Sequence, residues 1–271
     1  MLAFPNAKIN IGLQIISKRS DGYHNIATCF YPIGWADALE IIEDKHTSFT
    51  SSGIAIPGSN QDNLCLKAYN LIKKDFDIPP VHIHLHKVIP IGAGLGGGSS
   101  DAGFTIKLIN QKFELNISDN IMENYGGQLG SDCAFFIRNS PTLATEKGEI
   151  FEPISVNLKG YFILLVYPNI HVSTATAYSG VQPKISGINL KDSISSDISL
   201  WKNSVINDFE NSVFAQFPLI SKIKNDLYTN GAEYAAMSGS GSTVFGIFKH
   251  QPDANIFKTE NNLVFEEEIK W

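Results

Sequence analysis

The glycine-rich segment at residues 90–102, Pro-Ile-Gly-Ala-Gly-Leu-Gly-Gly-Gly-Ser-Ser-Asp-Ala, restricts the possible folds of this chain more than any other stretch. Five of the seven residues from Gly92 to Gly98 are glycine, and ordering such a run costs backbone entropy. The segment lies between a strand pattern and a helical pattern, and Ser99, Ser100 and Asp101 are of types that cap helices. Because free N–H groups and the helix dipole at such a start attract anions, we expect a polyphosphate here.

Three other interpretations of this segment can be weighed on its residues. A mobile surface turn remains open, because a glycine motif alone is weakly specific. A P-loop would require Gly-Lys followed by Ser or Thr, and the segment contains no lysine. A Rossmann fingerprint matches at Gly92, Gly94 and Gly97, but it needs an acid that ends a second strand about twenty residues later. Glu114 does not end an apolar strand, so a dinucleotide site is disfavoured.

The composition narrows the classes of function. A formal net charge of −6 argues against non-specific nucleic-acid binding, which requires a basic surface. The first residues hold no basic segment followed by a long apolar run, and the longest apolar run, 161–167, is too short to cross a bilayer. Cys29, Cys65 and Cys133 have no metal-type spacing, and their odd number argues against a disulfide framework. We therefore expect a cytoplasmic protein without a membrane or nucleic-acid partner.

Hydrophobic periodicity predicts strands and helices without a strict βαβ rhythm, which indicates an α+β fold. Residues 7–16 alternate as a half-buried strand whose polar face carries Lys8 and Asn10. Further strands are expected at 27–35, 38–43, 81–89, 161–167, 232–236 and 243–248, and a strand with a turn at 141–151. Helices are expected at 63–76, 99–112 and 211–227. Asp62 is the expected N-cap of the first helix. The pattern starts afresh near residue 152, which predicts domains at 1–152 and 153–271.

Two further residues have chemistry that suits phosphoryl transfer to an alcohol. Such a transfer needs a carboxylate that can accept the hydroxyl proton and a cation that stabilises negative charge. Lys8 lies on the polar face of the first strand, and Asp132 precedes the apolar run 133–136. The residues alone also allow a solvated lysine and a turn or capping aspartate. A second flexible loop, Met-Ser-Gly-Ser-Gly-Ser-Thr at 237–243, can equally be a simple hairpin.

Taken together, these segments resemble the three motifs of the GHMP kinases, in chain order. They are Pro-Asn-Ala-Lys-Ile-Asn at 5–10, the glycine segment 90–102 and Met-Ser-Gly-Ser-Gly at 237–241. Within that superfamily, Arg-Ser-Asp-Gly-Tyr-His at 19–24 and Leu-Gly-Ser-Asp at 129–132 resemble the 4-diphosphocytidyl-2-C-methylerythritol kinases. The resemblance spans nearly the whole chain, whereas the stretch 187–204 resembles nothing that can be anchored.

The resemblance implies a fold and a reaction. The fold is a GHMP kinase N-terminal ATP-binding domain like domain 2 of ribosomal protein S5, followed by a ferredoxin-like C-terminal domain. The reaction is ATP-dependent phosphorylation of the 2-hydroxyl of 4-diphosphocytidyl-2-C-methylerythritol in non-mevalonate isoprenoid synthesis. Asp132 matches the catalytic base and Lys8 the lysine that orients it. Magnesium is implied with ATP, with Ser100 as a possible ligand, and the protein is expected to be a monomer or weak homodimer.

The resemblance also implies two sets of binding residues. The ATP-binding set comprises Asn63 near the adenine and the phosphate loop Pro90, Ile91, Gly92, Ala93, Gly94, Leu95, Gly96, Gly97, Gly98, Ser99 and Ser100. The set for the cytidyl diphosphate sugar alcohol comprises Asn10, Tyr23, His24, Thr174 and Tyr178, with Tyr23, His24 and Tyr178 around the cytosine ring. From the residues alone, Tyr23 and His24 can be an ordinary loop aromatic and a solvated histidine, and Tyr178 an ordinary core or surface aromatic.

Two questions remain open on the sequence. His82, His84 and His86 share one strand face, but same-face neighbours lie about 7 Å apart, so a solvated face is favoured over a zinc site. The alternatives for function are another GHMP kinase, acting on homoserine, mevalonate or a sugar, or a non-catalytic nucleotide-binding protein. An NAD-dependent oxidoreductase is disfavoured by the missing acid.

Overall fold

The computed structural model describes residues 1–183 and 187–270, which fold into two compact units. Unit 1 comprises residues 1–8, 34–91 and 96–140; unit 2 comprises the described residues of 9–33, 92–95 and the chain from 141 onward. The chain therefore passes between the units several times, whereas the sequence prediction divides it once, between residues 152 and 153. Two of the passages interrupt segments with predicted site residues, because Lys8 and Ile9 belong to different units and so do Leu95 and Gly96.

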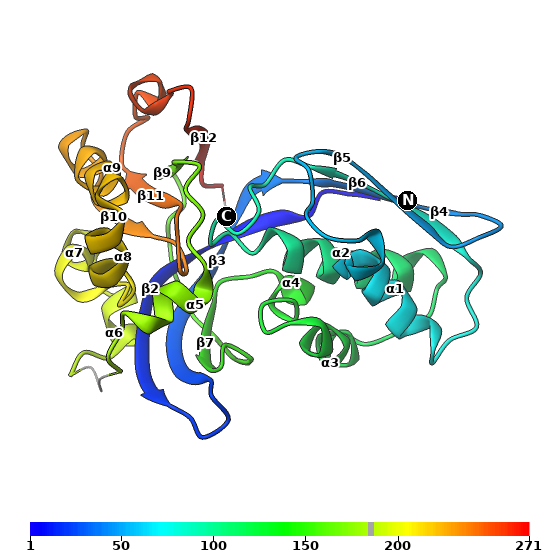
Figure 1. The fold of residues 1–271 in the computed structure, drawn as a ribbon. Coiled ribbons are helices and arrows are strands. Elements are labelled where there is room, and N and C mark those ends of the chain that lie inside the picture. Colours follow the sequence, from blue (N-terminus) through cyan, green and yellow to red (C-terminus); the bar gives the residue numbers. More distant parts are fainter. Residues whose placement is uncertain (184–186, 271) are drawn as a thin grey trace. The chain divides into compact units, whose positions relative to one another are not determined.

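Unit 1 is a four-stranded sheet with helices on one of its faces (Figure 1). The sheet order is β1-β4-β6-β5, with β5 parallel to β6 and the other pairs antiparallel. Its strands are β1 (Leu2–Ala3), β4 (Ala38–Glu43), β5 (Ser48–Gly53) and β6 (Val81–Lys87). Its helices are α1 (Leu64–Lys73), α2 (Gly97–Lys112), α3 (Asp119–Leu129) and α4 (Phe135–Arg138), and the 3₁₀ turn Asn60–Asp62 precedes α1. The sheet buries Ile83 and Leu85 against α1 and α2, which forms the core.

Unit 2 contains two four-stranded sheets and several short helices (Figure 1). One sheet has the order β2-β3-β7-β8, formed by β2 (Asn6–Lys18), β3 (His24–Ala36), β7 (Thr142–Glu146) and β8 (Ile150–Pro153). The first three residues of β2 and the last three of β3 belong to unit 1. The other is antiparallel, with the order β10-β11-β9-β12, formed by β9 (Phe162–Tyr167), β10 (Tyr234–Met237), β11 (Val244–Phe248) and β12 (Leu263–Glu268). The helices are α5 (Thr174–Ser179), α6 (Leu190–Ile194), α7 (Trp201–Ser204), α8 (Glu210–Gln216) and α9 (Pro218–Thr229). Ile223 and Leu227 of α9 pack on the second sheet.

The α+β prediction is confirmed, and so are most of the predicted strands. The predicted helix at 211–227 is two helices, because Pro218 begins α9 after α8 has ended at Gln216. β1, β5 and β12 were not predicted, since they are short or polar. The stretch 187–204, which could not be anchored in the sequence, contains α6, α7 and the 3₁₀ turn Ile198–Leu200.

Both predicted helix caps are wrong. Asn63, not Asp62, caps α1, because its side-chain oxygen accepts the N–H of Cys65 at 2.8 Å. The N-cap of α2 is Gly96, which makes no side-chain capping bond, so Ser99, Ser100 and Asp101 lie inside the helix. The helix starts earlier than expected because its N-cap residue has a left-handed conformation, φ 68°, which glycine readily adopts.

Strand β2 is also more buried than its alternation indicates. Residues 7–13 are buried on both faces, and Lys8 and Asn10 are only 3% and 2% exposed. An ammonium group in such a place costs free energy unless it is paired, so the polar face of β2 is a functional candidate rather than a solvated surface. Among the described residues, no helix is long and apolar enough to cross a membrane.

Candidate active site

The N-terminus of α2 has the properties of an anion-binding site. α2 is sixteen residues long, and the N–H groups of its first three residues have no acceptor within the helix. A Cβ atom on Gly97 would lie 2.9 Å from Lys87 Nζ and 3.0 Å from Ile89 Cγ2, so a larger residue at this first helical position would displace these side chains. Ser100 Oγ is buried and has no hydrogen-bond partner among the described residues. A ligand that supplies an acceptor or a metal ion would satisfy that hydroxyl.

Lys8 and Asp132 form an ion pair beside this helix terminus. The Nζ atom of Lys8 lies 3.4 Å from Oδ2 of Asp132, and the side chains are 4% and 34% exposed. A Cβ atom on Gly96 would lie 3.1 Å from Lys8 Cε, which places the lysine stem against the N-cap of α2. The structure thus brings together a carboxylate that solvent and ligands can reach, a buried cation and an anion site, all within unit 1.

Close packing against α2 fixes the loop that carries Asp132. A Cβ atom on Gly103 of α2 would lie 2.9 Å from Phe136 Cβ and 3.0 Å from the carbonyl oxygen of Cys133. The N–H of Cys133 donates to the carbonyl of Gly130 at 3.1 Å, which closes the turn around Asp132. Burial raises the pKa of the Cys133 thiol to about 11, so this neighbour of Asp132 is not a thiolate nucleophile.

The middle of the glycine loop, residues 92–95, belongs to unit 2 and is held by the second glycine loop. Ser238 Oγ donates to the carbonyl of Gly94 at 2.8 Å, and the N–H of Thr243 donates to the carbonyl of Ala93 at 3.2 Å. A Cβ atom on Gly94 would lie 2.0 Å from the carbonyl oxygen of Ser238. The segment 237–243 does join β10 to β11 as a hairpin loop, and it also supports the first loop.

Asn10 connects strand β2 to the same arrangement in unit 2. Its N–H donates to Ser238 Oγ at 3.2 Å, and its side-chain amide donates to Thr28 Oγ1 at 2.9 Å. Asn207 donates to the carbonyls of Met237 and Gly239, at 2.7 and 2.8 Å, and so fixes the second glycine loop from its other side. Sequence reasoning missed Asn207, because its burial to 1% exposure has no signature in the chain.

An aromatic cluster contains two of the predicted substrate residues. The rings of His24 and Tyr178 stack with centroids 4.6 Å apart and an interplanar angle of 19°. Phe209, which the sequence did not indicate, contacts Tyr178 edge to face at 4.8 Å. Burial lowers the pKa of His24, and the charge of Lys18 lowers it further, so the imidazole is neutral near pH 7.

Tyr23 and Thr174 lie at the surface of unit 2. Tyr23 is 61% exposed, with Lys147 Nζ 5.4 Å from its ring centroid, and its N–H donates to Asp21 Oδ1 at 3.1 Å. Arg19 contacts both Asp21 and Glu146, which orders the turn that presents the tyrosine. Thr174 is the exposed first residue of α5, one turn before Tyr178.

Comparisons with known proteins identify the family of this chain. The model for the N-terminal domain of GHMP kinases matches residues 63–140, and the model for the C-terminal domain matches residues 190–266. The 4-diphosphocytidyl-2-C-methyl-D-erythritol kinase of Cytophaga hutchinsonii is 56% identical over 262 residues, 96% of this chain and 97% of that protein. The kinase of the same name from Bacteroides fragilis is 51% identical over 274 residues, 100% of both chains. This chain belongs to that family of GHMP kinases.

A solved structure of this kinase family is also similar. The crystal structure of a 4-(cytidine 5'-diphospho)-2C-methyl-D-erythritol kinase matches with a TM-score of 0.77 at 27% identity, over 91% of this chain and 90% of the other. The family assignment confirms the resemblance inferred from the motifs. The two matched domain models lie on either side of residue 152, but the predicted boundary itself stays a prediction.

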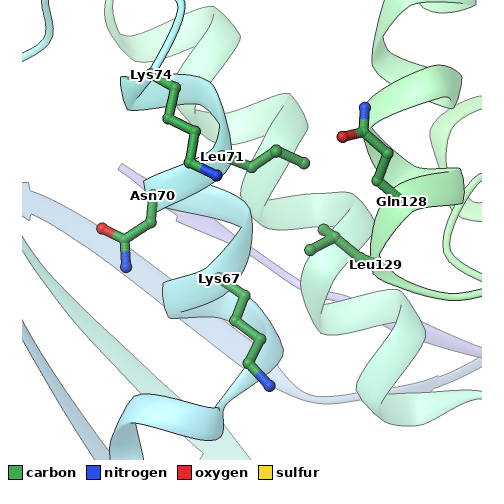
Figure 2. A pocket seen from close by; sticks show the side chains of 6 residues that line it. All are labelled: Lys67, Asn70, Leu71, Lys74, Gln128 and Leu129. Carbon is green, nitrogen blue, oxygen red and sulfur yellow. The ribbon is translucent and has the colours of Figure 1, made fainter.

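In this GHMP kinase the structure places Asn63 at the start of α1, partly buried and engaged as its N-cap. Further along α1, a hollow of about 290 Å³ opens between α1 and α3 (Figure 2). It is lined by Lys67, Asn70, Leu71, Lys74, Gln128 and Leu129. None of the predicted site residues lines this hollow, and Lys67 is already paired with Asp62 at 3.6 Å.

The histidine row of the kinase forms a hydrogen-bonded ladder rather than a bare solvated face. Residues 48, 50 and 52 of β5 interleave with the imidazoles of β6, so that Thr50 Oγ1 contacts both His82 Nε2 at 3.1 Å and His84 Nδ1 at 2.8 Å. Ser52 likewise contacts His84 and His86. Within residues 1–183 and 187–270 no group of three His, Cys, Asp or Glu side chains could hold a metal ion. The hydroxyls thus contact both ring nitrogens of His82 and of His84, and Nδ1 of His86.

Proposed function

We propose that this kinase transfers the γ-phosphoryl group of ATP to the 2-hydroxyl of 4-diphosphocytidyl-2-C-methyl-D-erythritol, with Asp132 as the proton acceptor. The observation that carries the proposal is the Lys8–Asp132 pair beside the N-terminus of α2. The name shared by relatives at 56% and 51% identity supports the choice of substrate.

In this proposal the phosphates of ATP lie on the glycine loop and the first turn of α2. The unpaired N–H groups and the helix dipole stabilise their charge. Mg²⁺ bound with ATP would supply positive charge to offset the negative charge of the phosphates. The buried, unpartnered Oγ of Ser100 fits a role as the protein's contact to that ion.

The transfer step needs little covalent work from the protein. The substrate oxygen forms a bond to the γ-phosphorus, the bond from that phosphorus to the leaving oxygen of ADP breaks, and the hydroxyl proton passes to the Asp132 carboxylate. Lys8 is buried and cannot be displaced by solvent, so its ammonium holds Asp132 in place and stabilises negative charge at the reaction centre.

Recognition of the cytidyl group falls to the aromatic residues of unit 2. Tyr178 is backed by Phe209 and offers a ring face for stacking, and the neutral imidazole of His24 can hydrogen-bond a base edge. In the present structure the imidazole of His24 stacks on the ring of Tyr178. The cytosine must therefore either displace His24 from this ring or add a third ring to the stack. Asn10 and Thr174 are proposed to contact the sugar-alcohol portion, and Asn63 to lie near the adenine.

The proposal also covers the cellular setting. Three buried free thiols fit a reducing cytoplasm, and the net charge of −6 argues against a nucleic-acid partner. We propose a monomer or weak homodimer.

The direct test measures ADP release from Mg-ATP with the cytidyl alcohol beside homoserine, mevalonate and galactose. We expect turnover with the cytidyl compound alone. Turnover with one of the other alcohols would keep the kinase chemistry and overturn the substrate assignment. Silence with all four, together with retained ATP binding by calorimetry, would instead indicate a non-catalytic nucleotide-binding protein.

Replacement of Tyr23 tests the cytidyl site separately. Tyr23→Ala is expected to raise the KM for the cytidyl substrate about 10-fold with kcat nearly unchanged, because stacking is lost equally in the ground and transition states. Steady-state kinetics in both substrates measure this. Phe4→Ala is the control, because Phe4 is also 61% exposed and belongs to unit 1. An effect of Tyr23→Ala confined to the KM for ATP would refute the placement.

A further inference from the structure

Unit 1 contains a buried cluster of three titratable side chains that the proposed reaction does not use. Lys87 Nζ donates to Oδ2 of Asp101 at 2.8 Å and also to Oδ2 of Asp37. The three side chains are no more than 4% exposed. Burial alone would lower the pKa of Lys87, but the carboxylates of Asp101 and Asp37 raise it above its ordinary value, so the ammonium stays charged. Apolar residues often stabilise such a position as well or better, which raises the question of what the cluster does.

The cluster lies at both ends of the phosphate loop. Lys87 is the last residue of β6, three residues before the loop, whereas Asp101 lies in α2 directly after it. Asp37 Oδ1 also accepts the N–H groups of Val88 at 2.6 Å and Ile89 at 2.8 Å, which are the two residues that enter the loop. The residues before the loop and the first turns of α2 after it are therefore hydrogen-bonded to the same cluster.

The ammonium of Lys87 also lies close to Gly97, the first residue of α2. Its Nζ atom would lie 2.9 Å from a Cβ atom on Gly97, so the space beneath this residue is filled. A displacement of Lys87 or of the Asp101 carboxylate therefore moves the first turn of α2, where the backbone N–H groups meet the phosphates. Displacements of about 1 Å can cost about 100-fold in rate when they misalign reacting groups.

We propose that Lys87 and Asp101 are positioning residues for ATP: the Asp37–Lys87–Asp101 cluster sets the spacing between the two ends of the phosphate loop. The inference rests on the proposed function in one respect, since it takes ATP phosphates as the occupant of that loop. The cluster and the cytidyl residues Tyr23, His24 and Tyr178 belong to different units, so the KM for the cytidyl substrate serves as an internal reference.

Asp101→Ala is the variant best suited to the test. It removes the hydrogen bond from Lys87 to α2 but leaves Lys87 paired with Asp37, so the buried ammonium keeps a carboxylate partner. We expect the KM for ATP, measured by steady-state kinetics, to rise about 10-fold or more. The Kd for ADP, measured by calorimetry, is expected to rise by about the same factor. The KM for the cytidyl substrate is expected to change less than about twofold. Asp101→Asn keeps an oxygen that accepts from Lys87 and is expected to restore ADP affinity to within about threefold of the wild type.

Tyr125→Phe provides the matched control for a loss of stability alone. It removes the 2.5 Å hydrogen bond from the Tyr125 hydroxyl to Asp75, which joins α3 to the end of α1 within unit 1 and away from the loop. If Asp101→Ala behaves like Tyr125→Phe, with a lower Tm but wild-type ADP affinity, the cluster only stabilises the unit and the inference is overturned. If the wild type turns over no alcohol yet Asp101→Ala still loses ADP affinity, the inference stands and the proposed function fails.

Discussion

Asp132→Asn is expected to lower kcat by about three orders of magnitude, because general-base catalysis of this kind contributes factors of about 10² to 10⁴. The amide has nearly the shape of the carboxylate but cannot accept the hydroxyl proton at neutral pH. Lys8 Nζ can still donate to the remaining side-chain oxygen across the 3.4 Å contact, so the local packing is preserved. The affinities for ATP and for the cytidyl substrate are expected to stay within about twofold.

Steady-state kinetics and calorimetry with both ligands measure this separation of turnover from binding. Ser131→Ala is the control, since Ser131 is the exposed residue next to Asp132 and removal of its hydroxyl leaves the carboxylate in place. A variant with unchanged kcat would remove Asp132 from the role of proton acceptor. A fall in kcat accompanied by an equal loss of ADP affinity would show that the aspartate holds the nucleotide instead.

The Lys8–Asp132 pair illustrates what the sequence can and cannot predict. The residue types and their neighbours identified both side chains as candidates, and the family motifs assigned their roles. Periodicity could not show that β2 is buried on both faces, since alternation records only residue polarity along one strand. The distance between the two side chains depends on how α3, α4 and α2 pack, which long-range contacts decide.

The local predictions failed where backbone conformation overruled residue type. Ser99, Ser100 and Asp101 are common helix caps, yet the left-handed Gly96 takes that position and moves them into α2. The same shift leaves the Ser100 hydroxyl buried and brings Asp101 to Lys87. Asp37, Lys87 and Asp101 look like ordinary polar residues at strand and helix ends, and only the three-dimensional structure shows them as one buried cluster.

Gly94→Ala is expected to lower kcat/KM for ATP by about 100-fold or more and to reduce the Tm. Gly94 has a φ of +80°, which L residues rarely adopt, and the new Cβ atom would lie 2.0 Å from the carbonyl oxygen of Ser238. The carbonyl oxygen of Gly241 would lie only 3.2 Å away as well. Both neighbours are backbone atoms, so no side-chain rotation can relieve the overlap, and one of the two glycine loops must move.

Gly160→Ala separates this overlap from backbone strain. Gly160 has nearly the same conformation, φ +84°, but a Cβ atom there would have no neighbour within 4 Å. It should therefore show only the conformational cost of a left-handed L residue, about 1–2 kcal/mol of folding stability, with kinetics unchanged. If Gly94→Ala loses no more activity than Gly160→Ala, the two loops do not need their observed contact. If only Gly94→Ala raises the KM for ATP, the fit of the loop at residues 92–95 against the one at 237–243 sets the geometry in which the phosphates are received.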